Sequence, residues 1–192
     1  DLSESMTNLH VSLDDIRQAA VRIRPLARAT PLLTVEEDGG GVGRLALKCE
    51  NLQRSGAFKI RGAANMLLQL GPEERRRGVI TYSSGNHGIA MSLAASLAGC
   101  PAVVVMPTAA PAVKVEIARG LGAEIIFEGA TTVERRVRAE AEAAARGLTM
   151  MPPFDHRSIV AGQGTIGLEI LEQAPDAAVV YVPTSGGGLL AG

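Results

Sequence analysis

The chain has 192 residues, of which 46% are hydrophobic and 20% are charged. It carries 19 basic and 20 acidic residues, so its formal net charge of −1 provides no basic surface for nucleic acid. Three Phe, two Tyr and no Trp argue against an aromatic platform on which bases would stack. A globular chain of this size can bury roughly 70% of its extended surface.

No apolar stretch reaches the roughly 18 residues that a membrane span needs. Cys49 and Cys100 lie far apart without metal-ligand spacing, so we predict free thiols in a reducing compartment, the cytoplasm, and no metal site. No secretory leader is recognisable in the sequence. We interpret residues 1–5 as a cloning remnant in front of a native start at Met6.

The first predicted element is a helix over residues 13–24. Ser12 and Asp15 have the spacing of a capping box at its start. Apolar residues then recur on one helical face until Pro25 interrupts the pattern. A strand at 45–49 follows.

Lys59 stands where a polar turn becomes a helix, which is predicted over residues 60–70. The neutral amine attacks carbonyl groups, so an ordinary lysine with a pKa of about 10.4 is inert at neutral pH. Burial at such a turn lowers the pKa and prepares the amine for imine formation. For a lone lysine, a solvated cation at a helix start is the alternative interpretation.

From residue 79 onward, predicted strands and helices alternate. The strands are 79–82, 102–106 and 124–127, and the helices are 89–98, 111–119 and 132–146. Continuous apolar strands are typical of parallel sheets that are covered on both faces. We therefore predict a small α/β domain over residues 78–148, inserted between two parts of a larger domain, residues 1–77 and residues 149–192.

Residues 81–88, Thr-Tyr-Ser-Ser-Gly-Asn-His-Gly, concentrate hydroxyl, amide and imidazole groups at a predicted helix start. Unpaired backbone N–H groups and the helix dipole favour a carboxylate or another anion there. N-capping by Ser84 or Asn86 is the alternative, but capping needs one such residue. The pattern therefore predicts an anion-binding loop.

A strand predicted at Val179–Val182 runs into a glycine cup, Ser185-Gly186-Gly187-Gly188. Glycines let successive N–H groups turn toward one phosphate, because no Cβ blocks the approach. A flexible loop is the plain alternative. Gly186-x-Gly188-x-x-Ala191 also satisfies the dinucleotide fingerprint, which leaves a nicotinamide-dependent dehydrogenase as a second alternative.

Together, these motifs supply an imine-forming lysine, a carboxylate-binding loop and a phosphate cup. From about Leu13 to Gly192 the chain resembles the pyridoxal-phosphate enzymes of the threonine dehydratase and serine racemase family, known as fold type II. The segments that carry the resemblance are 50–53, 55–63, 83–87, 153–155, 161–169 and 185–189. It implies an α/β fold with two open, twisted, mostly parallel sheets flanked by helices.

The resemblance also implies roles for individual residues. Lys59 would bind pyridoxal 5'-phosphate covalently and act as the catalytic base, and the Phe58 ring would pack beside the cofactor. Asn86 would hydrogen-bond the phenolic oxygen of the cofactor. The phosphate would be bound by Ser185, Gly186, Gly187, Gly188 and Leu189, and the substrate carboxylate by Ser83, Ser84, Asn86 and His87. Ser84 is similar to the second catalytic group of serine racemases.

Three positions depart from the family pattern. Ala57 replaces a serine before the Phe-Lys pair, Ile89 stands where glutamine is usual, and Ser185 replaces the first glycine of the cup. These changes bear on the identity of the substrate more than on use of the cofactor.

The leading functional hypothesis is an ammonia-lyase that converts a small hydroxy amino acid, threonine or serine, into a 2-oxo acid and ammonia. A serine racemase, the dehydrogenase and a non-catalytic fragment are the alternatives. We expect a homodimer or a higher homo-oligomer. Relatives continue well past the cup, so an end at Gly192 leads us to expect a fragment with an incomplete larger domain.

Overall fold

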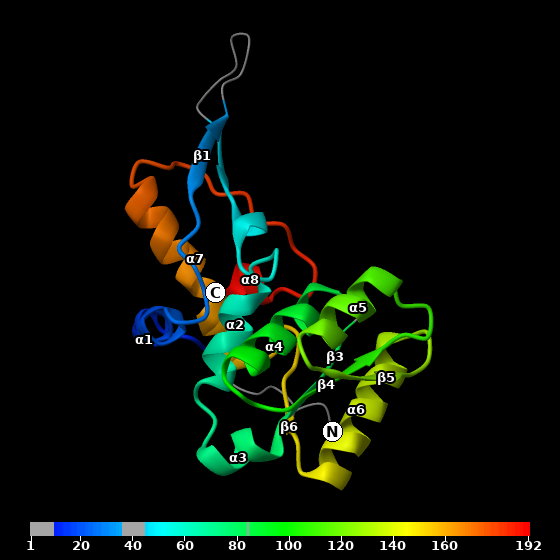
Figure 1. Cartoon of the computed structure of the whole chain (residues 1–192). Coiled ribbons are helices and arrows are strands. Elements are labelled where there is room, and N and C mark those ends of the chain that lie inside the picture. The colour runs from blue at the N-terminus through cyan, green and yellow to red at the C-terminus, as the bar shows by residue number, and fades with distance from the viewer. Residues whose placement is uncertain (1–9, 36–44, 84) are drawn as a thin grey trace, which may run out of the picture.

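The computed structural model describes residues 10–35, 45–83 and 85–192. Along the chain the elements are α1 (Leu13–Ile23), β1 (Leu32–Val35), β2 (Leu45–Lys48), the 3-10 turn η1 (Glu50–Leu52), α2 (Lys59–Leu67), α3 (Pro72–Arg77), β3 (Val79–Tyr82), α4 (Asn86–Leu97), β4 (Ala102–Met106), α5 (Ala112–Gly120), β5 (Glu124–Phe127), α6 (Thr132–Arg146), β6 (Thr149–Met150), α7 (Arg157–Gln173) and α8 (Gly188–Ala191). Helices and a parallel sheet confirm the predicted α/β class (Figure 1).

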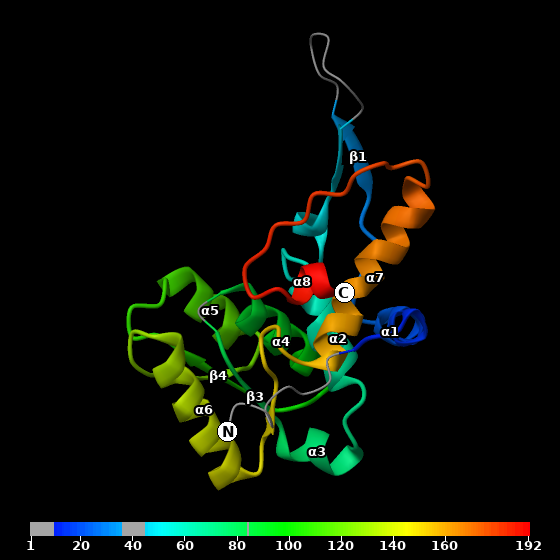
Figure 2. The ribbon, with the colours of Figure 1, turned by 180° about the vertical axis from the view of Figure 1, so that it is seen from behind.

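The parallel sheet has the strand order β5-β4-β3-β6. Val79 and Val104 face the apolar cluster shared with α4 and α5, whereas Ile80 and Val103 face a second cluster that includes Ala139 of α6. Figures 1 and 2 show α6 on one face of the sheet and α4 and α5 on the other. Alternate residues of each strand therefore anchor opposite helical layers.

Several predicted elements are confirmed residue by residue. β3, β4, β5 and α6 have the predicted bounds. The capping box of α1 is also present, because Ser12 Oγ accepts from the Asp15 N–H at 3.2 Å and the Asp15 carboxylate accepts from the Ser12 N–H at 2.9 Å. β6 extends the sheet two residues past the small domain that we propose at 78–148.

Other elements differ from the prediction. α4 begins at Asn86, three residues before the predicted start, so part of the polar motif lies within the first helical turn. The helix predicted at 60–70 starts at Lys59 and ends at Leu67. β1, α3 and α7 were not predicted. α7 contains three glycines, which lower helix propensity, and the helix depends on packing rather than on propensity.

The strand predicted at Val179–Val182 is wrong. These residues belong to neither sheet of the described chain, and Val179, Val180 and Tyr181 are 65%, 53% and 86% exposed. A strand needs a neighbour that accepts and donates its backbone hydrogen bonds, and no described strand lies beside this one. An apolar, β-branched run alone did not suffice.

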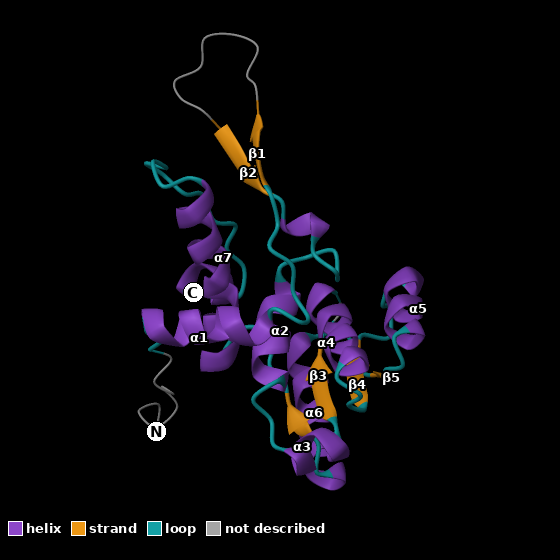
Figure 3. Cartoon of the chain, turned by 60° about the vertical axis from the view of Figure 1, so that its left-hand side comes forward, coloured by secondary structure: helices purple, strands orange, loops and turns teal. Residues whose placement is uncertain are grey.

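The second sheet of the described residues is an antiparallel ribbon of β1 and β2, with Leu33 opposite Leu47. Figure 3 shows this ribbon extending away from the helices and the parallel sheet. α2 packs directly on α7, and a Cβ on Gly162 would lie 2.6 Å from the Gly62 Cα. The two backbones approach each other so closely because both contact positions lack a side chain.

Candidate functional site

Lys59 is the first residue of α2, and Phe58 precedes it as the N-terminal cap without a side-chain capping bond. Gly56 turns the chain with a φ of 71°, a left-handed conformation that favours glycine. Lys59 Nζ donates a 2.7 Å hydrogen bond to the Pro153 carbonyl and lies 5.2 Å from the centre of the Phe58 ring. Burial lowers the pKa of the Lys59 amine, the direction that an imine-forming lysine requires.

The polar loop between β3 and α4 turns at Gly85, whose N–H donates to Ser83 Oγ at 3.2 Å. No described side chain caps α4, and the N–H groups at a helix start suit an anion. Asn86 is exposed at the first position of the helix. Ser84, for which we predict catalytic and carboxylate-binding roles, lies outside the described residues.

His87 points into the protein. Its side chain is 2% exposed, and Nε2 lies 3.1 Å from the Met151 carbonyl, so Nε2 carries the proton and donates. Burial lowers the pKa of His87 to about 4, and the imidazole is neutral at pH 7. Nδ1 is a buried acceptor without a partner among the described residues. The ring is thus directed away from the helix start, and the main-chain N–H of His87 is the group that suits an anion there.

The predicted glycine cup lies against Phe154. A Cβ on Gly186 would collide with the Phe154 ring, and a Cβ on Gly188 would lie 3.0 Å from the Phe154 carbonyl oxygen. Gly187 adopts a φ of 82°, which turns the chain into the short helix α8. Ser185 is exposed and Leu189 is half-buried at this turn. Glycine is thus required at all three positions for packing or for conformation.

One short segment, residues 151–154, joins the three predicted motifs. The Met151 carbonyl lies against His87, the Pro153 carbonyl accepts from Lys59, and Phe154 supports the cup. The resemblance included part of this segment, but no residue pattern predicted that it would contact all three motifs. The groups of this segment that make the contacts are mostly backbone carbonyls, which any residue can supply. The contacts therefore have no signature in the sequence.

Lys114 of α5 is a further candidate residue for this site, and no sequence motif predicted it. A Cβ on Gly85 would lie 3.1 Å from Lys114 Nζ, so the ammonium lies directly over the polar loop. Lys114 is half-buried and forms no ion pair or hydrogen bond with a described residue. A cation without a partner among the described residues, beside this helix start, would strengthen the attraction for an anion.

These features define a class of protein, an α/β fold in which a half-buried lysine, a helix start and a glycine turn together suit an anionic ligand that reacts with an amine. Residues 23–192 match the family model described as pyridoxal-phosphate dependent enzyme. The chain therefore belongs to that family, and the predicted fold class and cofactor are confirmed. The same glycines that satisfy the dinucleotide fingerprint thus lie in a family that uses a different cofactor.

Dehydratases and racemases are found among the similar proteins. The chain is 42% identical over 184 residues to a catabolic L-threonine dehydratase of Staphylococcus aureus, covering 95% of this chain and 53% of the relative. It is 41% identical over 181 residues to a serine racemase of Oryza sativa subsp. indica, covering 94% and 53%. The structure of maize serine racemase superimposes with a TM-score of 0.87 at 39% identity, covering 94% and 55%. The chain thus spans about half the length of these proteins.

The described residues fit pyridoxal phosphate. The cofactor presents an aldehyde, which suits an amine of lowered pKa, and a phosphate, which suits a glycine turn followed by a helix start. Phe154 leaves no room for a Cβ at Gly186 or Gly188, so no side chain can occupy these two positions of the turn. Among residues 10–35, 45–83 and 85–192, no cluster of three or more His, Cys, Asp or Glu could bind a metal ion, and no helix is long and apolar enough to cross a bilayer.

Proposed function

We propose that the full-length protein containing this chain is a pyridoxal-phosphate-dependent ammonia-lyase acting on a small β-hydroxy amino acid, with threonine or serine as the substrate. The supporting observation is the convergence of Lys59, the start of α4 and the glycine cup on residues 151–154. Homology to a threonine dehydratase over 95% of the chain supports the same activity.

Each motif has a proposed binding role. Lys59 would hold the cofactor covalently, Phe58 would pack beside it, and Asn86 would bind its phenolic oxygen. The N–H groups of residues 185–189 would bind the phosphate at a turn that places glycine next to a helix start. Ser83 and the first turn of α4 would bind the substrate carboxylate, with the Lys114 ammonium adding positive charge.

The bound cofactor supplies electron withdrawal from the substrate Cα. The Lys59 amine, released when the substrate amine takes its place, would accept the Cα proton, because burial favours the neutral form of the amine. The Cβ–O bond breaks and the hydroxyl leaves as water after receiving a proton. Hydrolysis of the elimination product then consumes one water molecule. The net products are therefore a 2-oxo acid and ammonia. Ser84, for which we propose an acid–base role, lies outside the described residues.

Borohydride trapping tests the site assignment. The chain has three lysines, Lys48, Lys59 and Lys114, and Lys48 is engaged by Glu169 at 2.6 Å. Reduction of the cofactor-loaded protein, followed by peptide mass analysis, is expected to place the adduct on Lys59. An adduct on Lys48 or Lys114 would contradict the assignment. Release of 2-oxo acid and ammonia from L-threonine and L-serine tests the reaction itself.

Serine racemisation is the second candidate, because serine racemases are found among both the sequence relatives and the structural neighbours. It requires a proton donor on the face of Cα opposite Lys59, for which we propose Ser84. Chiral analysis of unreacted serine separates the two activities. Inverted serine without 2-oxo acid would replace the lyase proposal with the racemase.

We further propose a homo-oligomeric protein in the cytoplasm. Cys49 and Cys100 are both buried, and both are free thiols in the structure. Free thiols suit a reducing compartment. Size-exclusion chromatography with light scattering of the full-length protein tests the oligomeric state.

A further inference from the structure

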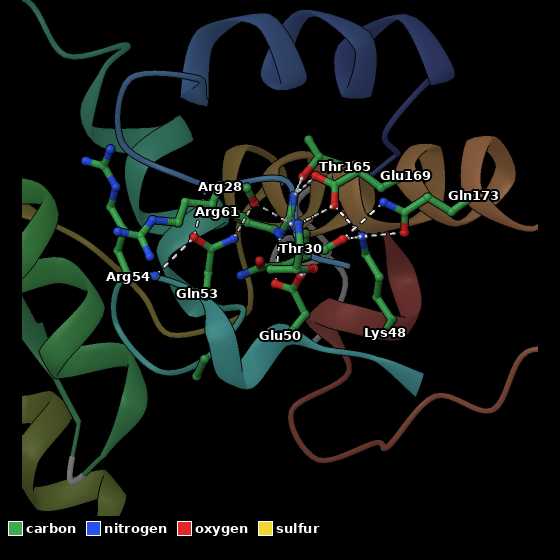
Figure 4. A network of polar contacts seen from close by, with 12 residues as sticks. Arg28, Thr30, Lys48, Glu50, Gln53, Arg54, Arg61, Thr165, Glu169 and Gln173 are labelled. Carbon is green, nitrogen blue, oxygen red and sulfur yellow. Dashed lines mark hydrogen bonds and ion pairs between the residues drawn. The ribbon is translucent and has the colours of Figure 1, made fainter. Parts of the chain in front are cut away.

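Arg61 lies two residues after Lys59 on α2, and its side chain is only 1% exposed. The guanidinium binds two carboxylates, each through two hydrogen bonds. Glu50 accepts from Nε at 2.8 Å and from Nη2 at 2.7 Å. Glu169 accepts from Nη1 at 2.6 Å and from Nη2 at 2.9 Å. Figure 4 shows Arg61 between these two acids.

The same network reaches four other parts of the chain. Lys48 Nζ donates to Glu169 at 2.6 Å and to the Thr30 carbonyl at 2.6 Å, and Arg61 Nη1 also donates to Thr165 Oγ1 at 3.1 Å. β2, η1, α2, α7 and the segment before β1 are therefore tied to one guanidinium. Two positive and two negative groups balance, so the network carries no net charge.

Stability alone is a weak explanation for this network. Removing two ion pairs from water costs about as much as their mutual attraction returns, and apolar residues of the same volume would stabilise such a site equally well. Paired hydrogen bonds to a planar guanidinium differ from apolar packing in being directional. They define how the elements are rotated and in which register they meet.

Directional bonds fix the rotation of α2 against α7 at several points. Gln163 Oε1 accepts from the Gly62 N–H at 3.3 Å, and Asn65 Nδ2 donates to the Ser158 carbonyl at 2.7 Å. Where the helices meet, a Cβ on Gly162 would lie 2.6 Å from the Arg61 carbonyl oxygen, and the Gln163 side chain packs against Gly62. Arg61 binds α7 through Thr165 and Glu169 from one side of α2. Lys59 leaves the helix about 200° around the axis from Arg61 and binds the Pro153 carbonyl. A rotation of α2 would move both side chains.

We propose that Arg61, held between Glu50 and Glu169, is a positioning residue that sets the direction in which α2 presents the Lys59 amine. Arg61 acts through the helix and touches neither the cofactor nor the substrate. The inference rests on the proposed function, because it assumes that Lys59 is the residue that binds the cofactor.

The test compares Arg61→Lys and Glu169→Gln with Arg146→Lys in the full-length protein. Lysine keeps the charge of Arg61 but cannot bind both carboxylates through paired bonds. Arg146→Lys is the matched control, because Arg146 also binds a glutamate, Glu124, through two bonds at 2.9 and 2.7 Å, with Glu142 at 3.5 Å, but at the surface. Each protein is freed of cofactor and reloaded at a temperature well below its unfolding midpoint.

Three quantities are measured: the rate of covalent attachment at Lys59 by borohydride trapping, the circular dichroism of the bound cofactor, and the unfolding midpoint. We expect attachment to slow tenfold or more in Arg61→Lys and Glu169→Gln, with weaker circular dichroism because the cofactor is held less uniformly. The Arg146→Lys control should match the wild type in both.

Folded Arg61→Lys and Glu169→Gln proteins with wild-type attachment rates and circular dichroism would overturn the inference, even if their unfolding midpoints fell. If Arg61→Lys does not fold, Glu169→Gln decides alone by the same two readouts. A wild-type protein that attaches the cofactor at another lysine refutes the proposed function instead. The two failures are therefore distinguishable.

Discussion

β4 and residues 179–182 have similar apolar sequences but different surroundings. Val104 of β4 is fully buried between Thr81 of β3 and Ile125 of β5, with helices over both faces of the sheet. Val180 is 53% exposed and pairs with no described strand. A β-branched segment thus forms a strand where neighbouring strands supply hydrogen bonds and helices bury its side chains. The same substitution in these two segments should therefore lower the free energy of unfolding by very different amounts.

The largest expected effect is the difference between Val104→Asp and Val180→Asp. An aspartate at 104 would be a buried carboxylate without a partner, and we expect a loss of more than about 4 kcal/mol, a large part of the roughly 5–15 kcal/mol of a typical domain. An aspartate at 180 should cost less than about 0.5 kcal/mol in the 192-residue chain. Urea unfolding followed by circular dichroism measures both.

Val104→Thr serves as a milder control, since it retains the shape of valine and adds one buried hydroxyl. Its cost should fall between those of the two aspartate variants. A large loss from Val180→Asp in this chain would show that residues 179–182 are covered in solution, and would contradict the comparison.

His87 connects the sheet region to the segment that carries the site, and it should make that connection sensitive to pH. Burial lowers its folded-state pKa to about 4, below an unfolded value of about 6.5. The unfolded chain therefore binds more protons between these values, and stability falls as the pH falls. The His87 contribution is complete above pH about 6.5, and about 3 kcal/mol is lost by pH 4.

Unfolding free energies of the wild type and His87→Gln, measured from pH 7.5 to pH 4, isolate this contribution. Glutamine can still donate to the Met151 carbonyl but does not titrate. The variant should lose less stability across this range than the wild type, although His156, whose pKa is also lowered by burial, still contributes. Parallel pH profiles would show that His87 is not buried in its neutral form.

Local sequence patterns predicted the elements that are determined by neighbouring residues. The capping box of α1 and the bounds of β3, β4, β5 and α6 follow from capping groups, strand composition and terminal glycines. α7 was missed because its glycines oppose helix formation, and contact with Gly62 compensates for them. That contact joins residues 100 positions apart, and no single-sequence pattern contains it.

The candidate site was predicted in a similar way. Lys59, the polar loop and the glycine cup each carry a local signal at a turn. Their meeting point at residues 151–154 does not, because the Met151 and Pro153 contacts use backbone carbonyls. The inward direction of His87 also depends on where Met151 lies. The sequence therefore indicated which chemical groups the candidate site contains, whereas their arrangement required the fold.

The smallest expected effect concerns Lys114, which belongs to the helices around the sheet but lies over the site loop. Lys114→Met removes an ammonium that lies 3.1 Å from the position of a Cβ on Gly85, at the open start of α4. A half-exposed charge interaction is worth about 0.4–1 kcal/mol, so we expect substrate binding to weaken about two- to fivefold. KM should rise while kcat changes little, because the ammonium attracts the carboxylate before and during the reaction alike.

Arg119→Met on the same helix, where the guanidinium lies 5.8 Å from the centre of the Phe127 ring, is the control and should leave KM unchanged. Equal KM values for Lys114→Met and the wild type in the full-length protein would show that the start of α4 binds the carboxylate without Lys114.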